Sequence, residues 1–160
     1  MKTKTDFSRP LIAAATVATI GPNVIFVRQP GGPYAGQLLL PGGKIDFQET
    51  ASAAACREFF EETGFAGYEP IFVRTYEIIG DSPDHHFFLV AFRFNAIGGA
   101  KAERECEPII AHPDSVVPHA TTRKILNDAG VGFYSESEIR FDLHKDGIFM
   151  SSLSDEEMWR

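Results

Sequence analysis

Short apolar runs bounded by glycine, proline and polar residues are the most regular feature of the chain. Runs of this kind, rich in Val, Ile and Phe, are typical of β-strands. We expect strands at residues 11–20, 24–28, 38–40, within 65–79, and at 85–94. The first two flank Gly21-Pro22-Asn23, a sequence that favours a turn, so they are predicted to pair with each other.

Two segments carry the composition and the end signals of helices. Residues 50–63 are rich in alanine and are followed by Gly64, a typical C-cap, and residues 121–129 are followed by Gly130. Strands interleaved with two helices, without a long βαβ rhythm, predict an α/β fold in which helices cover a mixed sheet. Residues 95–114 are expected to be irregular.

The C-terminal part of the chain has a different pattern. Residues 139–144 alternate between apolar and polar side chains, and Asp146-Gly147 resembles a hairpin turn before the apolar residues 148–150. We therefore predict a C-terminal β-hairpin, within an extension (133–160) of a domain formed by residues 1–132. The free strand edges of such a hairpin lead us to predict pairing across a homodimer.

Length and composition are those of one soluble globular domain. The 160 residues are 44% hydrophobic and 23% charged, which excludes a disordered or collagen-like chain. The two cysteines lack zinc spacing and no apolar run is long enough for a bilayer, so we expect no membrane partner and a cytoplasmic protein with reduced thiols. A secretory signal is an alternative for the N-terminal apolar run, but Asp6, Arg9 and Pro10 separate that run from the first lysines.

The helix predicted at 50–63 concentrates negative charge on one side. At about 100° per residue, Glu58, Glu61 and Glu62 fall within an arc of roughly 100°. They repel one another, and they lie in the last turn, where the helix dipole already disfavours anions. A solvated acidic surface is one explanation, but bound Mg²⁺ or Mn²⁺ would explain why the carboxylates are kept together. Arg57 lies beside them and is suited to hold a carboxylate in place, unless it forms only an ordinary surface ion pair.

The remaining side of the same helix is predicted to face the core. Its members are Ala53, Cys56, Phe59, Phe60 and Thr63.

The overall formal charge is −7 at pH 7. A chain this acidic is not expected to bind a nucleic acid polymer. A small phosphate ligand is not excluded, because a bound divalent cation reverses the local charge.

The segment from Gly43 to Phe65 matches the Nudix box, GX5EX7REUXEEXGU, at all of its specified positions. The matching residues are Gly43, Glu49, Arg57, Glu58, Phe59, Glu61, Glu62, Gly64 and Phe65. A chance match is on the order of one in 10⁸ per window at average residue frequencies. The chain therefore resembles a Nudix hydrolase, and the order of predicted elements around the box is similar to that of a Nudix domain.

The resemblance implies an α/β/α sandwich with a mixed sheet, and Mg²⁺-dependent hydrolysis of a diphosphate linkage in a small nucleoside diphosphate derivative. It implies that Glu58, Glu61 and Glu62 are metal ligands, with the Gly42 carbonyl as a further ligand. Glu49 then corresponds to a supporting carboxylate, and Arg57 to the arginine that orients the ligating glutamates. Such a reaction also needs a general base that takes a proton from the attacking water.

Candidates for that base lie in two places. Glu58 is the candidate within the box, and Glu103, Glu105 and Glu107 are candidates in the segment after the strand predicted at 85–94. An exposed acidic loop explains the last three residues at least as well.

The box does not select a substrate. A modified nucleoside triphosphate, or a compound of the ADP-ribose or nucleotide-sugar type, is expected, and Pro83 is a loose match to a proline that marks many ADP-ribose-type members. Tyr34, Phe87 and Phe88 are candidates for base stacking, although aromatic residues in strands more often belong to the core. The alternatives are a nucleotide-sensing Nudix module without catalysis, and a diphosphate isomerase on the same fold, which would require a catalytic cysteine.

Two residues depart from the pattern common in the family. Leu38 stands where many members carry Trp, and this is expected to alter the substrate pocket. Gln48 stands where Gly usually precedes the first glutamate of the box, and this is expected to stiffen the loop.

Overall fold

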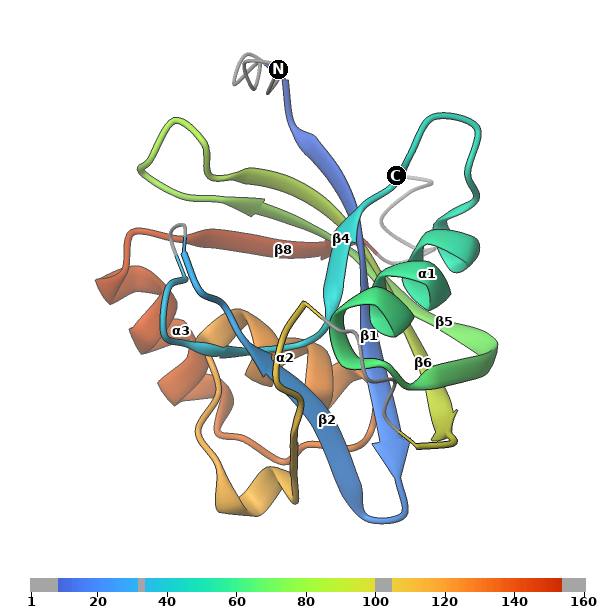
Figure 1. Cartoon of the computed structure of the whole chain (residues 1–160). Helices are drawn as coiled ribbons and strands as arrows, with labels where there is room; N and C mark the ends of the chain where they lie inside the picture. The colour runs from blue at the N-terminus through green and yellow to red at the C-terminus, as the bar shows by residue number, and fades with distance from the viewer. Residues whose placement is uncertain (1–8, 32–33, 100–104, 154–160) are drawn as a thin grey trace.

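A computed structural model describes residues 9–31, 34–99 and 105–153 of the chain (Figure 1). The strands are β1 (Leu11–Ile20), β2 (Asn23–Arg28), β3 (Leu38–Leu39), β4 (Gly42–Lys44), β5 (Ala66–Ile79), β6 (His86–Ile97), β7 (Ile109–Ala111) and β8 (Phe149–Leu153). The α-helices are α1 (Ala51–Thr63), α2 (Ala120–Asp128) and α3 (Glu136–Lys145), and a single 3-10 turn covers Pro113–Ser115. The strands and the two helices predicted in the first 132 residues are all present, and β4 and β7 are additional short strands.

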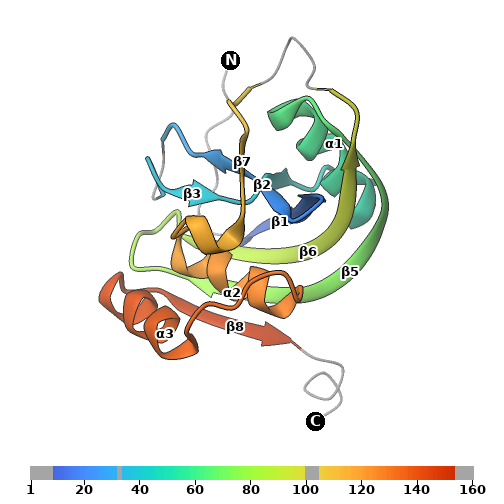
Figure 2. The same cartoon turned by 90° about the horizontal axis from the view of Figure 1, so that it is seen from below.

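The strands form a mixed sheet in the order β3-β2-β1-β6-β5-β8, with β4 paired to β1 and β7 paired to β2. β1 and β6 run parallel, whereas the other pairs are antiparallel. Figure 2 shows β5 and β6 as a long, curved pair that extends past the rest of the sheet. β1 lies at the centre, which places its backbone beside both β4 and β6.

Helices cover both faces of the sheet, and the alternation of side chains along β1 shows why. Ala14 and Ala18 belong to apolar clusters that include residues of α1. Val17, on the opposite face, packs in the larger cluster with Ile125 and Leu126 of α2. Figure 2 shows α1 on one side of the sheet and α2 with α3 on the other. This arrangement confirms the predicted α/β/α sandwich.

Helix α1 ends at the predicted C-cap, but its buried face differs from the prediction. The Thr50 side chain accepts a hydrogen bond from the Ala53 N–H, and Gly64 closes the helix with φ 77°. Ala53 and Phe60, which we expected on the core side, are exposed. The buried residues are Ala54, Ala55, Phe59, Glu62 and Thr63. The helix is therefore rotated toward its carboxylates, because Ala54 and Ala55 allow it to approach the sheet closely.

The prediction of a C-terminal hairpin was wrong in its first strand. Residues 136–145 form α3, with Ser135 as the N-cap, acidic residues in the first turn and basic residues in the last. Only Ile139 is buried in this helix, so the apolar-polar alternation does not mark a strand here. Gly147, at φ 68°, turns the chain into β8, which pairs antiparallel with β5. The second half of the predicted hairpin is thus a strand, but its partner lies in the main sheet.

Among the described residues, no helix is both long enough and apolar enough to cross a membrane. Cys56 and Cys106 are both free thiols. β8 lies at the edge of the sheet order. The homodimer and the domain boundary at residue 132 stay predictions.

Candidate functional site

The acidic side of α1 faces β4 and β1 rather than open solvent. Glu62 is 8% exposed, and the Glu58 side chain is 15% exposed, whereas the Glu61 side chain is 43% exposed. The Gly42 N–H donates a hydrogen bond to Glu62 Oε1 at 3.3 Å. The predicted site carboxylates therefore lie between the helix and β4, and their exposure increases from Glu62 through Glu58 to Glu61.

Glycines in β4 make this close approach sterically possible. A Cβ atom on Gly43 would lie 2.5 and 2.6 Å from the two carboxylate oxygens of Glu58, and one on Gly42 would overlap the Ala14 carbonyl oxygen. A side chain at position 42 would push β4 away from β1, and a side chain at position 43 would displace the Glu58 carboxylate. The Gly42-Gly43 pair thus lets a carboxylate of α1 lie directly against the backbone of β4.

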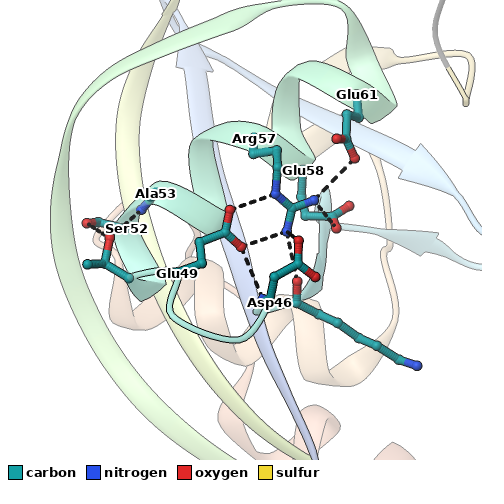
Figure 3. Close-up of polar contacts among 9 residues, drawn as sticks. Asp46, Glu49, Ser52, Ala53, Arg57, Glu58 and Glu61 are labelled. Carbon is teal, nitrogen blue, oxygen red and sulfur yellow. Dashed lines mark hydrogen bonds and ion pairs between the residues drawn. The ribbon is translucent and has the colours of Figure 1, made fainter.

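Arg57 connects most of the site carboxylates (Figure 3). Its Nε and Nη2 donate to both oxygens of Glu49, at 2.7 and 2.8 Å, in a bidentate pair. Its Nη1 donates to Glu58 at 2.8 Å and to Glu61 at 3.3 Å, and Nη2 also donates to the Lys44 carbonyl at 3.0 Å. These bonds lower the pKa of Glu49 to about 2. One guanidinium therefore brings together Glu49, Glu58 and Glu61 at the N-terminal end of the acidic face.

The negative charges of two carboxylates, Glu62 and Glu58, are poorly balanced in spite of this arginine. Burial, together with the negative charges of Glu58, Glu105 and Glu61, raises the pKa of Glu62 to about 8. Burial also raises the pKa of Glu58, although Arg57 opposes the shift. The site therefore carries more negative charge than its single cation balances.

The segment after β6 docks on the last turn of α1. The Glu105 N–H donates to the Glu61 carbonyl and the Cys106 N–H donates to the Glu62 carbonyl, each at 3.1 Å. These bonds satisfy carbonyls that the end of a helix leaves without a partner. Glu105 is exposed but adds to the negative field at Glu58 and Glu62.

The other two loop candidates for the general base have different positions. Glu107 is exposed and lies two residues before β7. Glu103 lies outside the described residues. Of the three loop glutamates, the structure thus brings Glu105 to the acidic face.

The donor atoms at this face suit a hard divalent cation. Carboxylate oxygens in a negatively charged, partly buried setting are what Mg²⁺ and Mn²⁺ prefer. Within the part of the chain that the structure describes, however, no three acidic, histidine or cysteine side chains converge as a metal-binding group. Arg57 draws Glu58 and Glu61 toward its guanidinium, while Glu62 is bonded to Gly42. The donor atoms therefore have the chemistry that the cation requires. Their positions in this structure are set by the hydrogen bonds to Arg57 and Gly42.

A cavity of about 230 Å³ begins at this face and continues between the sheet and α2. Glu62, Gly42 and Gly43 line the end nearest the carboxylates. The rest of the lining is largely apolar and includes Leu11, Leu39, Leu40, Phe87, Leu89 and Ile125, with Gln29, Tyr34, Lys44, Thr121 and Thr122 as polar members. Of the three aromatic residues considered for base stacking, Tyr34 and Phe87 line the cavity. The remaining lining residues had no local signal in the sequence, because they come from strands and a helix far apart along the chain.

Gln48 adopts the left-handed backbone conformation that its position requires. Its φ is 65°, and Glu69 is the other non-glycine residue with positive φ among the described residues. This explains why glycine is usual before the first glutamate of the box. We expect Gln48→Gly to raise the free energy of unfolding by about 0.5–1 kcal/mol in urea denaturation. The matched control is Gln37→Gly, an exposed glutamine without positive φ, where a loss of stability is expected; equal effects at both positions would contradict this account.

Comparison with known proteins places the chain in a family. The family model described as the NUDIX domain matches residues 10–123. An ADP-ribose pyrophosphatase from Methanocaldococcus jannaschii is 26% identical over 93 residues, which cover 58% of this chain and 55% of that protein. The chain thus aligns with about half the length of this curated relative.

Solved structures share the fold. A MutT NUDIX hydrolase from Burkholderia pseudomallei has a TM-score of 0.68 at 23% identity, covering 75% of this chain and 98% of that one. The NUDIX domain of Shewanella oneidensis NrtR, solved with ADP ribose, has a TM-score of 0.65 at 15% identity, covering 76% of this chain and 87% of that one. Since the NUDIX domain model matches well over half of the sequence and the fold is the same, the chain belongs to the NUDIX family.

Proposed function

We propose that this protein hydrolyses a diphosphate linkage in a small nucleoside diphosphate derivative of the ADP-ribose or nucleotide-sugar type, with Mg²⁺ or Mn²⁺ as cofactor. The observation that carries the proposal is the position of Glu62, a buried carboxylate that belongs both to the acidic face and to the cavity. A ligand that fills the cavity therefore ends beside the carboxylates. The names of the M. jannaschii relative and of the S. oneidensis complex support ADP-ribose as the first compound to test.

We assign the cation to Glu58, Glu61 and Glu62, with the Gly42 carbonyl as a further ligand. When bound, the metal neutralises the diphosphate oxygens and lowers the pKa of a bound water. Arg57 and Glu49 act as positioning residues, because the bidentate pair between them fixes the guanidinium that contacts Glu58 and Glu61.

Glu58 is the residue to which we assign proton abstraction from the attacking water. Its carboxylate lies against Gly43 and is mostly buried, and burial raises its pKa, which makes it a stronger proton acceptor. Glu105 is exposed, whereas Glu58 is mostly buried beside the other carboxylates of the helix. The loop glutamate is the weaker candidate for this reason.

The cavity supplies a place for the nucleoside. Leu39 and Leu89 offer apolar surface on which a base can lie flat, and Thr121 and Thr122 supply hydroxyls along its edge. With the nucleoside in this position, the diphosphate reaches the carboxylates at Glu62.

The test is a hydrolysis assay on ADP-ribose, ADP-glucose and a panel of nucleoside triphosphates, with AMP release as the measurement. We expect ADP-ribose to give AMP and ribose 5-phosphate in the presence of Mg²⁺, EDTA to reduce the rate to background, and Mg²⁺ or Mn²⁺ to restore it. Turnover that is unaffected by EDTA would contradict the cofactor assignment. Binding without turnover of any compound would favour the nucleotide-sensing alternative.

The diphosphate isomerase alternative receives no support from the cysteines. Cys56 packs against the apolar cluster that contains Phe59 and Phe94. Burial and the neighbouring carboxylates Glu62 and Glu105 raise the pKa of Cys106, which keeps its thiol protonated.

A further inference from the structure

A second pocket, of about 400 Å³, adjoins the cavity at Tyr34. Tyr34 lines both spaces. The other lining residues are Gln37, Asp81, Ser82, His85, His119, Asp146 and Ile148. They come from the β2–β3 and β5–β6 connections, the start of α2 and the end of α3, and none of them belongs to the acidic face of α1. We call this space the Tyr34 pocket.

Tyr34 lies where the cavity and the Tyr34 pocket meet, and the imidazole rings of His85 and His119 contact it from the side of the pocket. The Tyr34 hydroxyl is hydrogen-bonded to His85 Nε2, and the rings of Tyr34 and His119 meet edge to face with centroids 4.5 Å apart. A Cβ atom on Gly80 would overlap the His85 imidazole, and one on Gly147 would overlap the Asp81 carboxylate. Close backbone approach at these two glycines holds the histidine and the carboxylate in place.

The rings are uncharged near neutral pH. Burial lowers the pKa of His119 to about 4 and also lowers that of His85, while burial raises the pKa of Tyr34. The Thr121 N–H donates to His119 Nδ1, so the neutral imidazole carries its proton on Nε2. That Nε2 lies 3.9 Å from Asp146 Oδ2. The phenol of Tyr34 keeps its proton and is hydrogen-bonded to His85 Nε2.

The charge in the Tyr34 pocket is therefore negative. Asp81 and Asp146 are the charged members of its lining, and none of the described residues that line it is a lysine or an arginine. Carboxylates accept hydrogen bonds but have no proton to donate. A phosphate group in this space would meet two like charges without a cation, whereas an amino or hydroxyl group would find acceptors.

We propose that the Tyr34 pocket is a specificity site. It contacts the end of the substrate that lies in the cavity, away from the diphosphate. It selects an uncharged group that donates hydrogen bonds and it rejects a phosphate at that end. The proposal rests on the proposed function, because it assumes that the diphosphate lies at the Glu62 end of the cavity. The amino group of a base and the hydroxyls of a sugar offer the same donor chemistry, so the experiment separates these two sources.

The first experiment compares substrates that differ in a single donor group. In the base arm, ADP-ribose is compared with inosine diphosphate ribose, in which a carbonyl replaces the amino group of adenine. In the sugar arm, ADP-ribose is compared with the β-methyl ester of ADP, which lacks the terminal sugar. We expect kcat/KM to fall about tenfold or more in one arm, mainly through KM, because a site built around a donor leaves its acceptors unpaired without it. Equal kcat/KM values within both arms would overturn the proposal.

The second experiment removes the acceptor charge. The discrimination is the ratio of the kcat/KM values of the two substrates, taken in the arm in which the wild type distinguishes them. Asp146→Asn and Asp81→Asn are each expected to reduce this ratio about fivefold or more, with kcat little changed. The matched control is Asp114→Asn, whose side chain is 77% exposed and lies outside the pocket lining, and it is expected to leave the discrimination unchanged. Discrimination that survives both pocket substitutions in folded proteins would overturn the proposal.

Binding of adenosine, inosine and ribose, measured by calorimetry without metal, separates this proposal from the proposed function. If one of these phosphate-free compounds binds and Asp146→Asn weakens its binding, the Tyr34 pocket is a donor site even when no diphosphate is hydrolysed. If ADP-ribose is hydrolysed but neither substitution changes the discrimination, the specificity proposal fails while the proposed function stands.

Discussion

Glu62→Gln is expected to reduce the Mg²⁺-dependent hydrolysis of ADP-ribose on the order of 10³-fold while leaving the fold intact. Glutamine keeps the size of the side chain and an oxygen that accepts the Gly42 N–H. It removes the charge of the one carboxylate shared by the acidic face and the cavity. The measurement is steady-state kinetics at several Mg²⁺ concentrations, in which both the maximal rate and the apparent affinity for Mg²⁺ should fall.

The same substitution is expected to raise the free energy of unfolding of the metal-free protein by about 1 kcal/mol. Glu62 is buried among Glu58, Glu61 and Glu105, and its charge is unfavourable there when no cation is present. The control is Glu138→Gln, an exposed glutamate in the first turn of α3, for which activity should not change and the free energy of unfolding should fall by about 0.5 kcal/mol or less, because only a favourable charge near the helix N-terminus is lost. Unchanged hydrolysis by Glu62→Gln would remove this residue from the proposed metal site.

Arg57→Ala is expected to lower both activity and stability. The guanidinium forms hydrogen bonds with Glu49, Glu58 and Glu61 and with the Lys44 carbonyl, and without it the carboxylates repel one another. Because its side chain is 29% exposed, we expect a loss of about 2 kcal/mol in the free energy of unfolding. We also expect kcat/KM to fall about 10–100-fold, as is typical when a residue that orients metal ligands is removed.

Arg57→Lys separates charge from geometry. Lysine keeps the positive charge but cannot form the bidentate pair with Glu49, so it should restore part of the stability and little of the activity. Arg140→Ala, at an exposed position on α3, should change the stability by less than about 0.5 kcal/mol. If Arg57→Lys is as active as the wild type, Arg57 acts through its charge alone and does not position Glu58 and Glu61.

Local signals in the sequence predicted much of the fold. The alanines and Gly64 are within or beside α1, and the turn at Gly21-Pro22-Asn23 lies between the two strands that it joins. Such signals act over a few residues, and the structure agrees with them. At residues 139–144 the alternation indicated a strand, but the N-cap at Ser135 and the charges at both ends of α3 stabilise a helix instead. An exposed helix with one buried residue has no strong helical period, which is why the pattern was misleading.

The sequence by itself determined the family and the chemical character of the site, because the spacing of the box places its glutamates on one side of a helix and beside an arginine. Only the tertiary structure decided how this side is oriented. The small residues Ala54 and Ala55 and the glycines of β4 allow α1 to approach the sheet until Glu62 is buried. The cavity and the Tyr34 pocket likewise depend on segments that are distant along the chain, and their positions are fixed by strand pairing and by packing between layers, which act over long separations and leave no local pattern.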